Sequence, residues 1–317
     1  MRSVIDSHLS DGTLDSLAAD VRHGLGLPLK EIPPKYFYDA RGSELFEQIT
    51  TLPEYYPTRC ERALLNRHAP EIAALTEAEE LVELGSGTAS KTRALLYAMA
   101  GDGRLRSYVP FDVSETVVRE CIDLLAELFP GISLHGVVGD FESHLEQIPP
   151  GRERLTAFLG GTIGNFYPLE RSMLLERLPG VGEWLLIGTD LVKEAAVIEA
   201  AYNDDAGVTA EFNRNVLHAI NRELDADFDP DAFDHVAFFD SENEWVEMRL
   251  RAQSDQQVAI RGAGLTVDIA EGEDIRTEIS SKFTPERIAS ELDAAGFELK
   301  HFYTDGLFGL SLARRRG

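Results

Sequence analysis

The sequence is short of cysteine, of basic residues and of long apolar runs. Its 317 residues include only 2 cysteines, Cys60 and Cys121, which provide neither a disulfide framework nor a metal-ligand spacing. No apolar run approaches the roughly 20 residues that a membrane helix requires. The N-terminal residues also lack the apolar core of a secretory signal. We therefore expect a cytoplasmic protein with no membrane partner.

Positive charge is equally scarce. Lysine and arginine total 30 against 55 aspartate and glutamate residues, which gives a formal net charge of −25. This field repels phosphate backbones, so we expect no nucleic-acid partner. The 8 histidines are scattered and form no His-Glu-x-x-His motif, so we expect no bound metal. We expect a monomer, although no residue pattern fixes the oligomeric state.

The chain has enough apolar residues for a large core, 44% of the total, and a glycine-rich turn that follows an apolar run. Residues 81–84 run into Gly85 and Gly87, and residues 89–99 are predicted to form the next helix. Glycine lets the backbone approach a ligand closely. Asp112 ends the next predicted strand 27 positions after Gly85, about where nucleotide-binding folds place a ribose-binding carboxylate. Ser90 stands where a dinucleotide motif has its third glycine, so the pattern favours another nucleoside cofactor.

Two further strand ends are distinctive. The apolar run from residue 134 ends at Asp140 and Phe141, which can bind an adenine amino group and cover the ring. Helix capping by Asp140 is an alternative that is compatible with this role. The predicted strand 156–159 runs into three glycines and Asn165. Such a loop is typical of backbone close to a ligand, and a glycine-rich loop without a ligand is the alternative.

Longer motifs connect these strand ends to a known family. Together, the glycines and acidic residues resemble the motif series of class I S-adenosylmethionine-dependent methyltransferases. Over nearly the whole chain, the sequence also resembles the histidine-specific Nα-methyltransferases of ergothioneine biosynthesis. The motifs that carry this resemblance occupy residues 36–46, 52–59, 160–166, 188–193, 201–207 and 277–283. The resemblance implies an α/β fold, with a Rossmann-like doubly wound class I methyltransferase sheet and a second, smaller α+β substrate domain.

The resemblance also implies the cofactor and its binding residues. S-Adenosylmethionine is expected to bind, and S-adenosylhomocysteine to leave, with no metal involved. Lys91 is expected to reach the cofactor's carboxylate, and a solvated lysine on a helix surface is the alternative. The expected cofactor-binding residues are Glu83, Gly85, Gly87, Lys91, Asp112, Asp140 and Phe141.

Alternating strand and helix patterns divide the chain into two domains. Residues 61–200 and 284–317 are predicted to form the cofactor-binding domain. Residues 1–60 and 201–283 are predicted to form the substrate-binding domain, and the first 60 residues are expected to have no place in the methyltransferase sheet. Within the substrate-binding domain we expect a helix at 208–224 and strands at 235–239, 244–252, 258–261, 265–269 and 275–281.

Two polar residues of the predicted strand 275–281 are candidates for substrate recognition. Glu278 and Ser280 are two positions apart, so their side chains point to the same face of the strand. On pattern alone, an exposed polar strand face is the better interpretation. In the family that the chain resembles, however, this Glu-x-Ser pair recognises the histidine side chain. Glu278 is then expected to accept a hydrogen bond from one imidazole nitrogen, while Ser280 bonds the other.

Neutral donors are expected to bind the substrate's carboxylate, because the surroundings are acidic. Tyr55, Asn165 and Tyr202 match the family positions for that task. Tyr56 adjoins Tyr55, and the sequence alone does not choose firmly between them. Each tyrosine taken alone is more typical of a core aromatic residue with a satisfied hydroxyl.

The resemblance places Tyr38 beside the substrate's amino group, where its hydroxyl or a water that it holds can help to carry a proton away. The expected catalytic residues are therefore Tyr38 and Asn165. Met248 is expected to bind the substrate as part of an apolar wall together with Phe46, and plain core residues are the alternative for both.

The sequence therefore predicts an S-adenosylmethionine-dependent L-histidine Nα-methyltransferase. As the resemblance implies, three successive transfers would give the betaine hercynine in ergothioneine biosynthesis. The amine must lose a proton before it attacks the methyl group, and positioning accounts for most of the remaining catalysis. The alternatives are an enzyme of the same family acting on another amino acid such as a tryptophan derivative, a nicotinamide-dependent oxidoreductase, and a binding protein without activity.

Overall fold

The computed structural model describes residues 3–9 and 13–317. These fold into two compact units, each built from separated stretches of chain. Of the described residues, the first unit comprises 3–9, Pro57–Val192 and Lys282–Gly317, and the second comprises 13–56 and Lys193–Ser281. The predicted ranges change at residues 60, 200 and 283, whereas the units change after residues 56, 192 and 281, and residues 3–9 belong to the first unit rather than the second.

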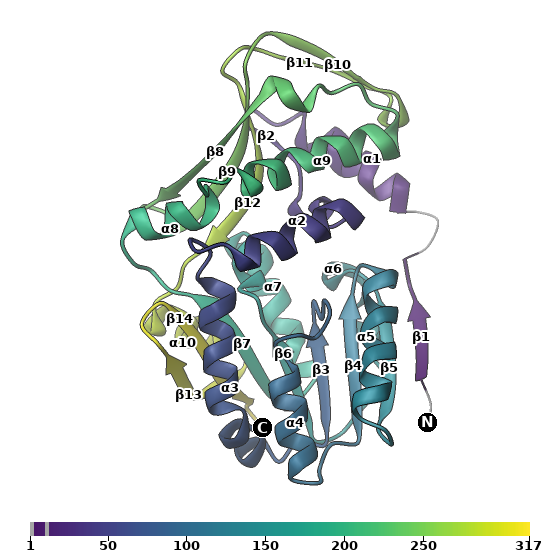
Figure 1. Ribbon diagram of the computed structural model, residues 1–317, viewed down its shortest axis with the longest axis vertical. Coiled ribbons are helices and arrows are strands. Elements are labelled where there is room, and N and C mark those ends of the chain that lie inside the picture. Colours follow the sequence, from purple (N-terminus) through teal and green to yellow (C-terminus); the bar gives the residue numbers. More distant parts are fainter. Residues whose placement is uncertain (1–2, 10–12) are drawn as a thin grey trace. The chain divides into compact units, whose positions relative to one another are not determined.

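The first unit is built on an eight-stranded sheet with the order β1-β5-β4-β3-β6-β7-β14-β13 (Figure 1). The pairs from β1 to β7 are parallel, and β14 pairs antiparallel with both β7 and β13. This mainly parallel sheet confirms the predicted doubly wound α/β fold. Its strands are β1 (Ser3–Ser7), β3 (Glu80–Leu84), β4 (Ser107–Asp112), β5 (Ser133–Val138), β6 (Arg154–Phe158), β7 (Trp184–Asp190), β13 (Phe297–Thr304) and β14 (Phe308–Arg315).

Strand β1 shows that one expectation was wrong, because the first 60 residues do take part in this sheet. All five residues of β1 pair in parallel with β5, from Ser3 opposite Leu134 to Ser7 opposite Val138. Four of the five are exposed, and Val4 is among them. An edge strand needs backbone pairing on one side only, so its sequence need not carry the apolar run that reveals an inner strand.

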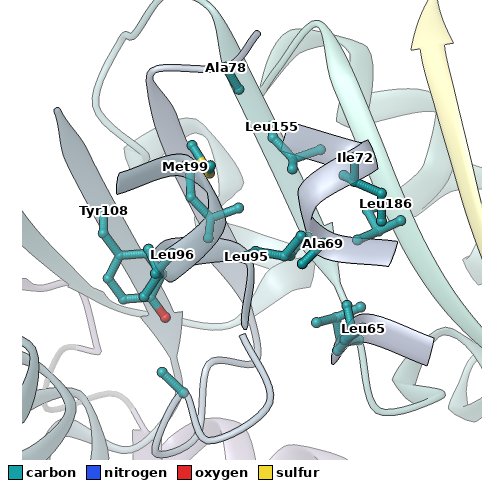
Figure 2. Close-up of a cluster of buried hydrophobic side chains, with 14 of the residues drawn as sticks. Leu65, Ala69, Ile72, Ala78, Leu95, Leu96, Met99, Tyr108, Leu155 and Leu186 are labelled. Atoms are coloured by element: carbon teal, nitrogen blue, oxygen red, sulfur yellow. The ribbon is translucent and has the colours of Figure 1, made fainter. Parts of the chain in front are cut away.

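Helices cover both faces of the sheet. α3 (Pro57–Thr76), α4 (Arg93–Gly101) and α5 (Glu115–Leu128) contribute to one buried cluster, which includes Leu186 of β7 and in which Leu96 lies beside Tyr108 of β4 (Figure 2). α7 (Pro168–Arg177) and α10 (Pro285–Ala294) contribute to a second cluster through Leu174 and Leu292. The shorter elements of this unit are α6 (Phe141–His144), η2 (Leu145–Gln147), η3 (Thr162–Asn165) and η4 (Leu178–Gly180).

Helix α4 begins at Arg93, four residues later than the predicted start at residue 89. Gly87 and Ala89 have positive φ angles of 49° and 52°. Because these angles belong to the left-handed region, the chain completes a turn before it can adopt helical dihedrals. The segment after β3 is therefore a longer turn than the glycine pattern indicates.

The second unit has the α+β composition that the sequence predicts. Its four-stranded sheet has the order β2-β12-β9-β8, and β10 and β11 form a separate hairpin. The strands are β2 (Lys30–Glu31), β8 (Phe233–Asp240), β9 (Trp245–Ala252), β10 (Gln256–Ile260), β11 (Leu265–Ile269) and β12 (Asp274–Ser281). The helices are α1 (Thr13–Gly24), α2 (Ala40–Thr51), α8 (Ala195–Tyr202) and α9 (Val208–Leu224), with the short η1 (Pro34–Phe37), η5 (Pro230–Ala232) and η6 (Arg261–Ala263).

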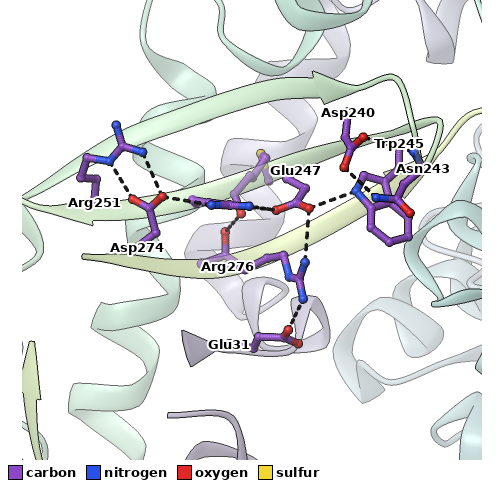
Figure 3. Close-up of polar contacts among 11 residues, drawn as sticks. Glu31, Asp240, Asn243, Trp245, Glu247, Arg251, Asp274 and Arg276 are labelled. Carbon is purple, nitrogen blue, oxygen red and sulfur yellow. Dashed lines mark hydrogen bonds and ion pairs between the residues drawn. The ribbon is translucent and has the colours of Figure 1, made fainter. Parts of the chain in front are cut away.

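A charged network stiffens the four-stranded sheet (Figure 3). Glu247 is 3% exposed and accepts from Trp245 Nε1 at 3.0 Å, Arg249 Nε at 2.8 Å and Arg276 Nη1 at 3.2 Å. Arg276 also pairs with Glu31 of β2. A buried carboxylate is tolerated only when it is paired and hydrogen bonded, and these donors meet that requirement. Trp245, Glu247 and Arg249 are odd-numbered residues of β9 and share this face, so the even-numbered Met248 points to the opposite face.

Candidate functional site

The predicted cofactor residues of the first unit lie at the carboxyl ends of neighbouring strands. β3, β4 and β5 are adjacent and parallel, and Gly85, Asp112 and Asp140 lie at their ends or within two residues of them. The backbone N–H groups of Gly85 and Ser86 donate to the Phe111 carbonyl at 2.8 and 3.1 Å. These bonds fasten the turn after β3 to the end of β4, at the sheet edge where open α/β folds bind ligands.

Asp112 fastens the same turn through its side chain. Its Oδ2 accepts from the Gly87 N–H at 3.0 Å, and its Oδ1 accepts from the Ser114 N–H at 3.0 Å. Burial raises the pKa of this carboxyl, and the backbone donors oppose the rise. A carboxylate offers about four lone-pair sites. Asp112 can therefore hold the glycine turn and still accept hydrogen bonds from two ribose hydroxyls.

Phe141 and Gly85 are brought together at this edge. The Phe141 ring stacks on Phe111 with centroids 5.4 Å apart. A Cβ built on Gly85 would lie 3.5 Å from Phe141 Cζ, and Gly85 has a φ of 70°. Asp140 directly precedes α6, and its carbonyl accepts from the His144 N–H at 2.9 Å. Asp140 thus stands at the helix-cap position that the sequence left open as an alternative.

Glu83 has both carboxylate oxygens bonded to protein hydroxyls. It is 3% exposed, and its oxygens accept from Thr92 Oγ1 and Tyr108 Oη. Burial raises the pKa of Glu83 to about 7, against the lowering effect of the two hydroxyl donors. The carboxylate therefore links β3 to β4 and to the residue before α4. Its role in cofactor binding stays a prediction, and this geometry favours support of the turn.

Replacement of Glu83 by glutamine is expected to flatten the pH dependence of stability. The folded-state pKa of about 7 lies above the ordinary value of 4.5, so between these values the folded chain binds more protons than the unfolded chain. The stabilisation from this group is present below the lower value and is lost as pH rises through the higher one, by about 3 kcal/mol.

Urea unfolding of wild type and Glu83→Gln, measured from about pH 5 to about pH 8, follows this loss as a changing difference in unfolding free energy. The exposed Glu286 provides the matched control, because Glu286→Gln is expected to leave the pH profile unchanged. A difference between wild type and Glu83→Gln that stays constant over this range would contradict the elevated pKa.

Lys91 is joined to a residue that the sequence interpretation missed. Glu61 of α3 is fully buried and forms an ion pair with Lys91 Nζ. Its two carboxylate oxygens also accept from the Gly160 N–H at 2.8 and 3.0 Å. One carboxylate therefore ties α3 to the turn before α4 and to the glycine loop after β6. The available signal was an acidic residue one turn before Leu64 and Leu65 on the buried stripe of a helix.

Asn165 closes η3 within that glycine loop. Gly160 and Gly161 have φ angles of 82° and 71°, which favour glycine. A Cβ on Gly160 would lie 3.4 Å from Lys91 Nζ. The predicted glycine loop and the predicted cofactor-binding lysine are therefore neighbours within the first unit.

The second unit brings three predicted substrate residues onto one face of its sheet. Glu278 and Ser280 of β12 are 9% and 5% exposed, and Met248 of β9 is the cross-strand partner of Glu278. Directly opposed residues of antiparallel strands share a face. The Tyr202 hydroxyl donates to Ser280 Oγ at 2.8 Å. Side chains from β9, β12 and the end of α8 thus meet, and Glu278 and Ser280 are buried rather than part of an exposed strand face.

An aromatic cluster in the same unit separates Tyr55 from Tyr56. Tyr55 lies edge-on to Phe46 and to Tyr202, with ring centroids 6.2 and 6.4 Å apart. The Tyr56 hydroxyl instead accepts a hydrogen bond from Lys193 Nζ at 2.7 Å. Since Tyr202 also contacts Ser280, the geometry favours Tyr55 as the pocket residue.

Tyr38 belongs to the same aromatic cluster. It follows η1, and its ring lies edge-on to Phe46 at 5.7 Å and to Phe212 of α9 at 5.8 Å. Aromatic neighbours on two sides hold the ring plane. The predicted catalytic tyrosine and the predicted apolar wall are therefore in contact.

Neither a metal-ligand cluster nor a membrane-spanning helix is found among residues 3–9 and 13–317. Within these residues, no three histidine, cysteine, aspartate or glutamate side chains are grouped so that they can hold a metal ion. The helices of the same residues do not include one with the length and apolar character needed to cross a bilayer.

The chain is similar to known proteins over nearly its whole length. The family described as "Histidine-specific methyltransferase, SAM-dependent" matches residues 17–315. A histidine N-alpha-methyltransferase of Mycobacterium tuberculosis is 50% identical over 322 residues, which cover 99% of this chain and 100% of the relative. Its counterpart in Mycolicibacterium smegmatis is 51% identical over 311 residues, which cover 96% and 97%. An L-tryptophan methyltransferase of Psilocybe serbica is 27% identical over 321 residues, which cover 90% and 89%.

Proposed function

Because the chain belongs to the histidine-specific, S-adenosylmethionine-dependent methyltransferase family, we propose that it methylates the α-amino nitrogen of L-histidine. Three successive transfers give hercynine, the trimethylated betaine of ergothioneine biosynthesis. The observation that carries the substrate assignment is the buried Glu278–Ser280 pair on one face of β12. A buried carboxylate beside a hydroxyl suits a side chain with one N–H donor and one nitrogen acceptor.

The imidazole is recognised by complementary hydrogen bonds. Glu278 accepts from the N–H of the ring. Ser280, whose oxygen accepts from the Tyr202 hydroxyl, is assigned the hydrogen bond to the other ring nitrogen. An amino acid with a hydrocarbon side chain leaves the buried carboxylate without that N–H. Its binding is therefore weakened by the free-energy cost of a buried charged acceptor that has no donor.

The substrate's backbone groups are assigned to neutral donors. Within the second unit, Tyr55 is assigned to the carboxylate. The Tyr202 hydroxyl gives its one proton to Ser280, so Tyr202 is assigned to holding Ser280 instead. Asn165 of the first unit stays a prediction for carboxylate binding. Tyr38 holds the amino group, and its hydroxyl or a water bonded to it accepts the proton that the ammonium must lose. The edge-on contacts of Tyr55 and Tyr38 support these roles, because they hold the plane of each ring.

When bound, S-adenosylmethionine supplies an electrophilic methyl group. The described residues of the first unit fit such a ligand, since Gly85 and Gly87 present no side chain to it and Asp112 has spare acceptor sites. The residues assigned to the substrate would hold its neutral amine for attack on that methyl group, which is mainly a positioning task. The first two products still carry a proton on nitrogen and must lose it before the next transfer, whereas the third product has none.

Incubation with each of the twenty amino acids and a methyl-labelled cofactor tests this function. Mass spectrometry is expected to show histidine gaining three methyl groups and the other amino acids gaining none. Preferential methylation of tryptophan would overturn the assignment of histidine as substrate, since tryptophan is the substrate named for the Psilocybe serbica relative. Saturable binding of histidine without any methylated product would indicate a binding protein instead.

A further inference from the structure

A buried amide connects the pocket strands of the second unit to helix α9. Asn213 of α9 is fully buried. Its Nδ2 lies 3.0 Å from the Arg249 carbonyl and 2.9 Å from His235 Nδ1. Its Oδ1 lies 2.6 Å from Thr277 Oγ1. One side chain thus bonds α9 to β8, β9 and β12.

The hydrogen-bond directions in this network are fixed by two carbonyl groups, which can only accept. His235 Nε2 faces the Tyr202 carbonyl at 2.8 Å and therefore carries the ring's proton. His235 Nδ1 is then the acceptor of the neutral ring. The amide nitrogen of Asn213 supplies one proton to His235 Nδ1 and the other to the Arg249 carbonyl, which leaves Oδ1 to accept from Thr277.

Every arm of the network ends beside a proposed substrate residue. Thr277 precedes Glu278, and its hydroxyl also lies 3.1 Å from the Met248 carbonyl. The His235 arm reaches the backbone of Tyr202, whose own hydroxyl donates to Ser280. The β9–β12 register shifts between Arg276 and Glu278, and such bulges re-aim side chains. This irregularity accompanies the turn of Thr277 toward Asn213.

We propose that Asn213, His235 and Thr277 are positioning residues that hold Tyr202, Met248, Glu278 and Ser280 in the geometry that binds histidine. This inference rests on the proposed function. None of the three residues is assigned a contact with the substrate, so each acts through the residue that it holds. A displacement of about 1 Å in a binding side chain is enough to impair a preorganised site. Burial lowers the pKa of His235, which agrees with a neutral ring that accepts from Asn213.

Thr277→Val is the first test, because it keeps the shape of the side chain and removes the hydroxyl. We expect the histidine KM to rise about fivefold to tenfold, with kcat and cofactor Kd changed less than about twofold. The same substitution at the exposed Thr266 of β11 is the matched control, and it is expected to leave all three quantities unchanged.

His235 provides the second test and a rescue. His235→Phe keeps a ring but removes both nitrogens, and we expect a histidine KM at least as high as that of Thr277→Val. His235→Gln can still donate an amide proton to the Tyr202 carbonyl, so it is expected to recover KM to within about threefold of wild type. Should His235→Phe fail to fold, Thr277→Val and His235→Gln decide the question.

The outcomes separate this inference from the function on which it rests. A wild-type protein that does not methylate histidine overturns the proposed function. An active wild type whose Thr277→Val and His235→Phe variants lose thermal stability but keep the wild-type histidine KM overturns the positioning role alone. A parallel loss of cofactor affinity in these variants overturns it as well, because general damage to the fold then explains both changes.

Discussion

Replacement of Asp112 by alanine is expected to weaken S-adenosylmethionine binding by roughly 30- to 150-fold, or about 2–3 kcal/mol. Two losses combine in this variant. The ribose hydroxyls lose a charged acceptor, and the N–H groups of Gly87 and Ser114 lose the oxygens that hold the glycine turn, each at 3.0 Å. Isothermal titration with the cofactor measures the change in Kd directly.

Asp112→Asn separates the two losses. Its single amide oxygen can satisfy either Gly87 or Ser114 but not both, and its NH₂ group faces a donor. We expect an intermediate Kd, about tenfold above that of wild type. Asp123 of α5 is exposed and serves as the matched control for removal of an aspartate from this unit. A folded Asp112→Ala protein with wild-type cofactor affinity would contradict the assignment of Asp112 to ribose binding.

The glycine turn after β3 and the acidic end of β4 were predictable because their signals are local. A glycine with φ near 70° and an acidic residue at the end of a short apolar run both follow from backbone geometry within a few residues. Gly85 and Asp112 belong to this class. The start of α4 was harder to place, since Ala89 adopts a left-handed conformation that its residue type does not announce.

Glu61 and Asn213 were not predictable in the same way, because their partners are distant in sequence. Glu61 binds the Gly160 N–H, 99 positions away. Asn213 binds Thr277, which is 64 positions away. In each case the sequence shows only a polar residue among the apolar positions of a helix. Such a residue indicates that a buried partner exists, but only the fold identifies which partner it is.

The expectation that the first 60 residues take no part in the sheet was wrong for a different reason, which β1 shows. Its five residues pair through the backbone at the edge of the sheet, and no apolar pattern is required of them. By contrast, the inner strands β3 and β6 are almost wholly buried and their apolar runs were read correctly. The strength of a sequence signal thus follows the burial of the element, and β1 is little buried because it lies at the edge of the sheet.

Replacement of Glu278 by alanine is expected to raise the histidine KM about 100-fold while the cofactor Kd stays within about twofold. The variant removes a buried charged acceptor and leaves the imidazole N–H without a partner. Glu278→Gln keeps the shape and one acceptor oxygen, so its KM is expected to rise only about tenfold. Steady-state kinetics with histidine, together with cofactor titration, measures both quantities, and the exposed Glu271 provides the matched control, Glu271→Ala.

The selectivity of Glu278→Ala distinguishes recognition from structural support. If the carboxylate binds the imidazole N–H, its removal lowers kcat/KM most for histidine. The ratio of kcat/KM for histidine to that for amino acids without a ring N–H must then fall. Glu278 could instead support β12, as Thr277 does through its hydroxyl contact with the Met248 carbonyl. In that case all amino acids are bound less well, and the ratio is preserved. A preserved ratio, or equal losses for histidine and cofactor, would remove the basis for assigning histidine to this pocket.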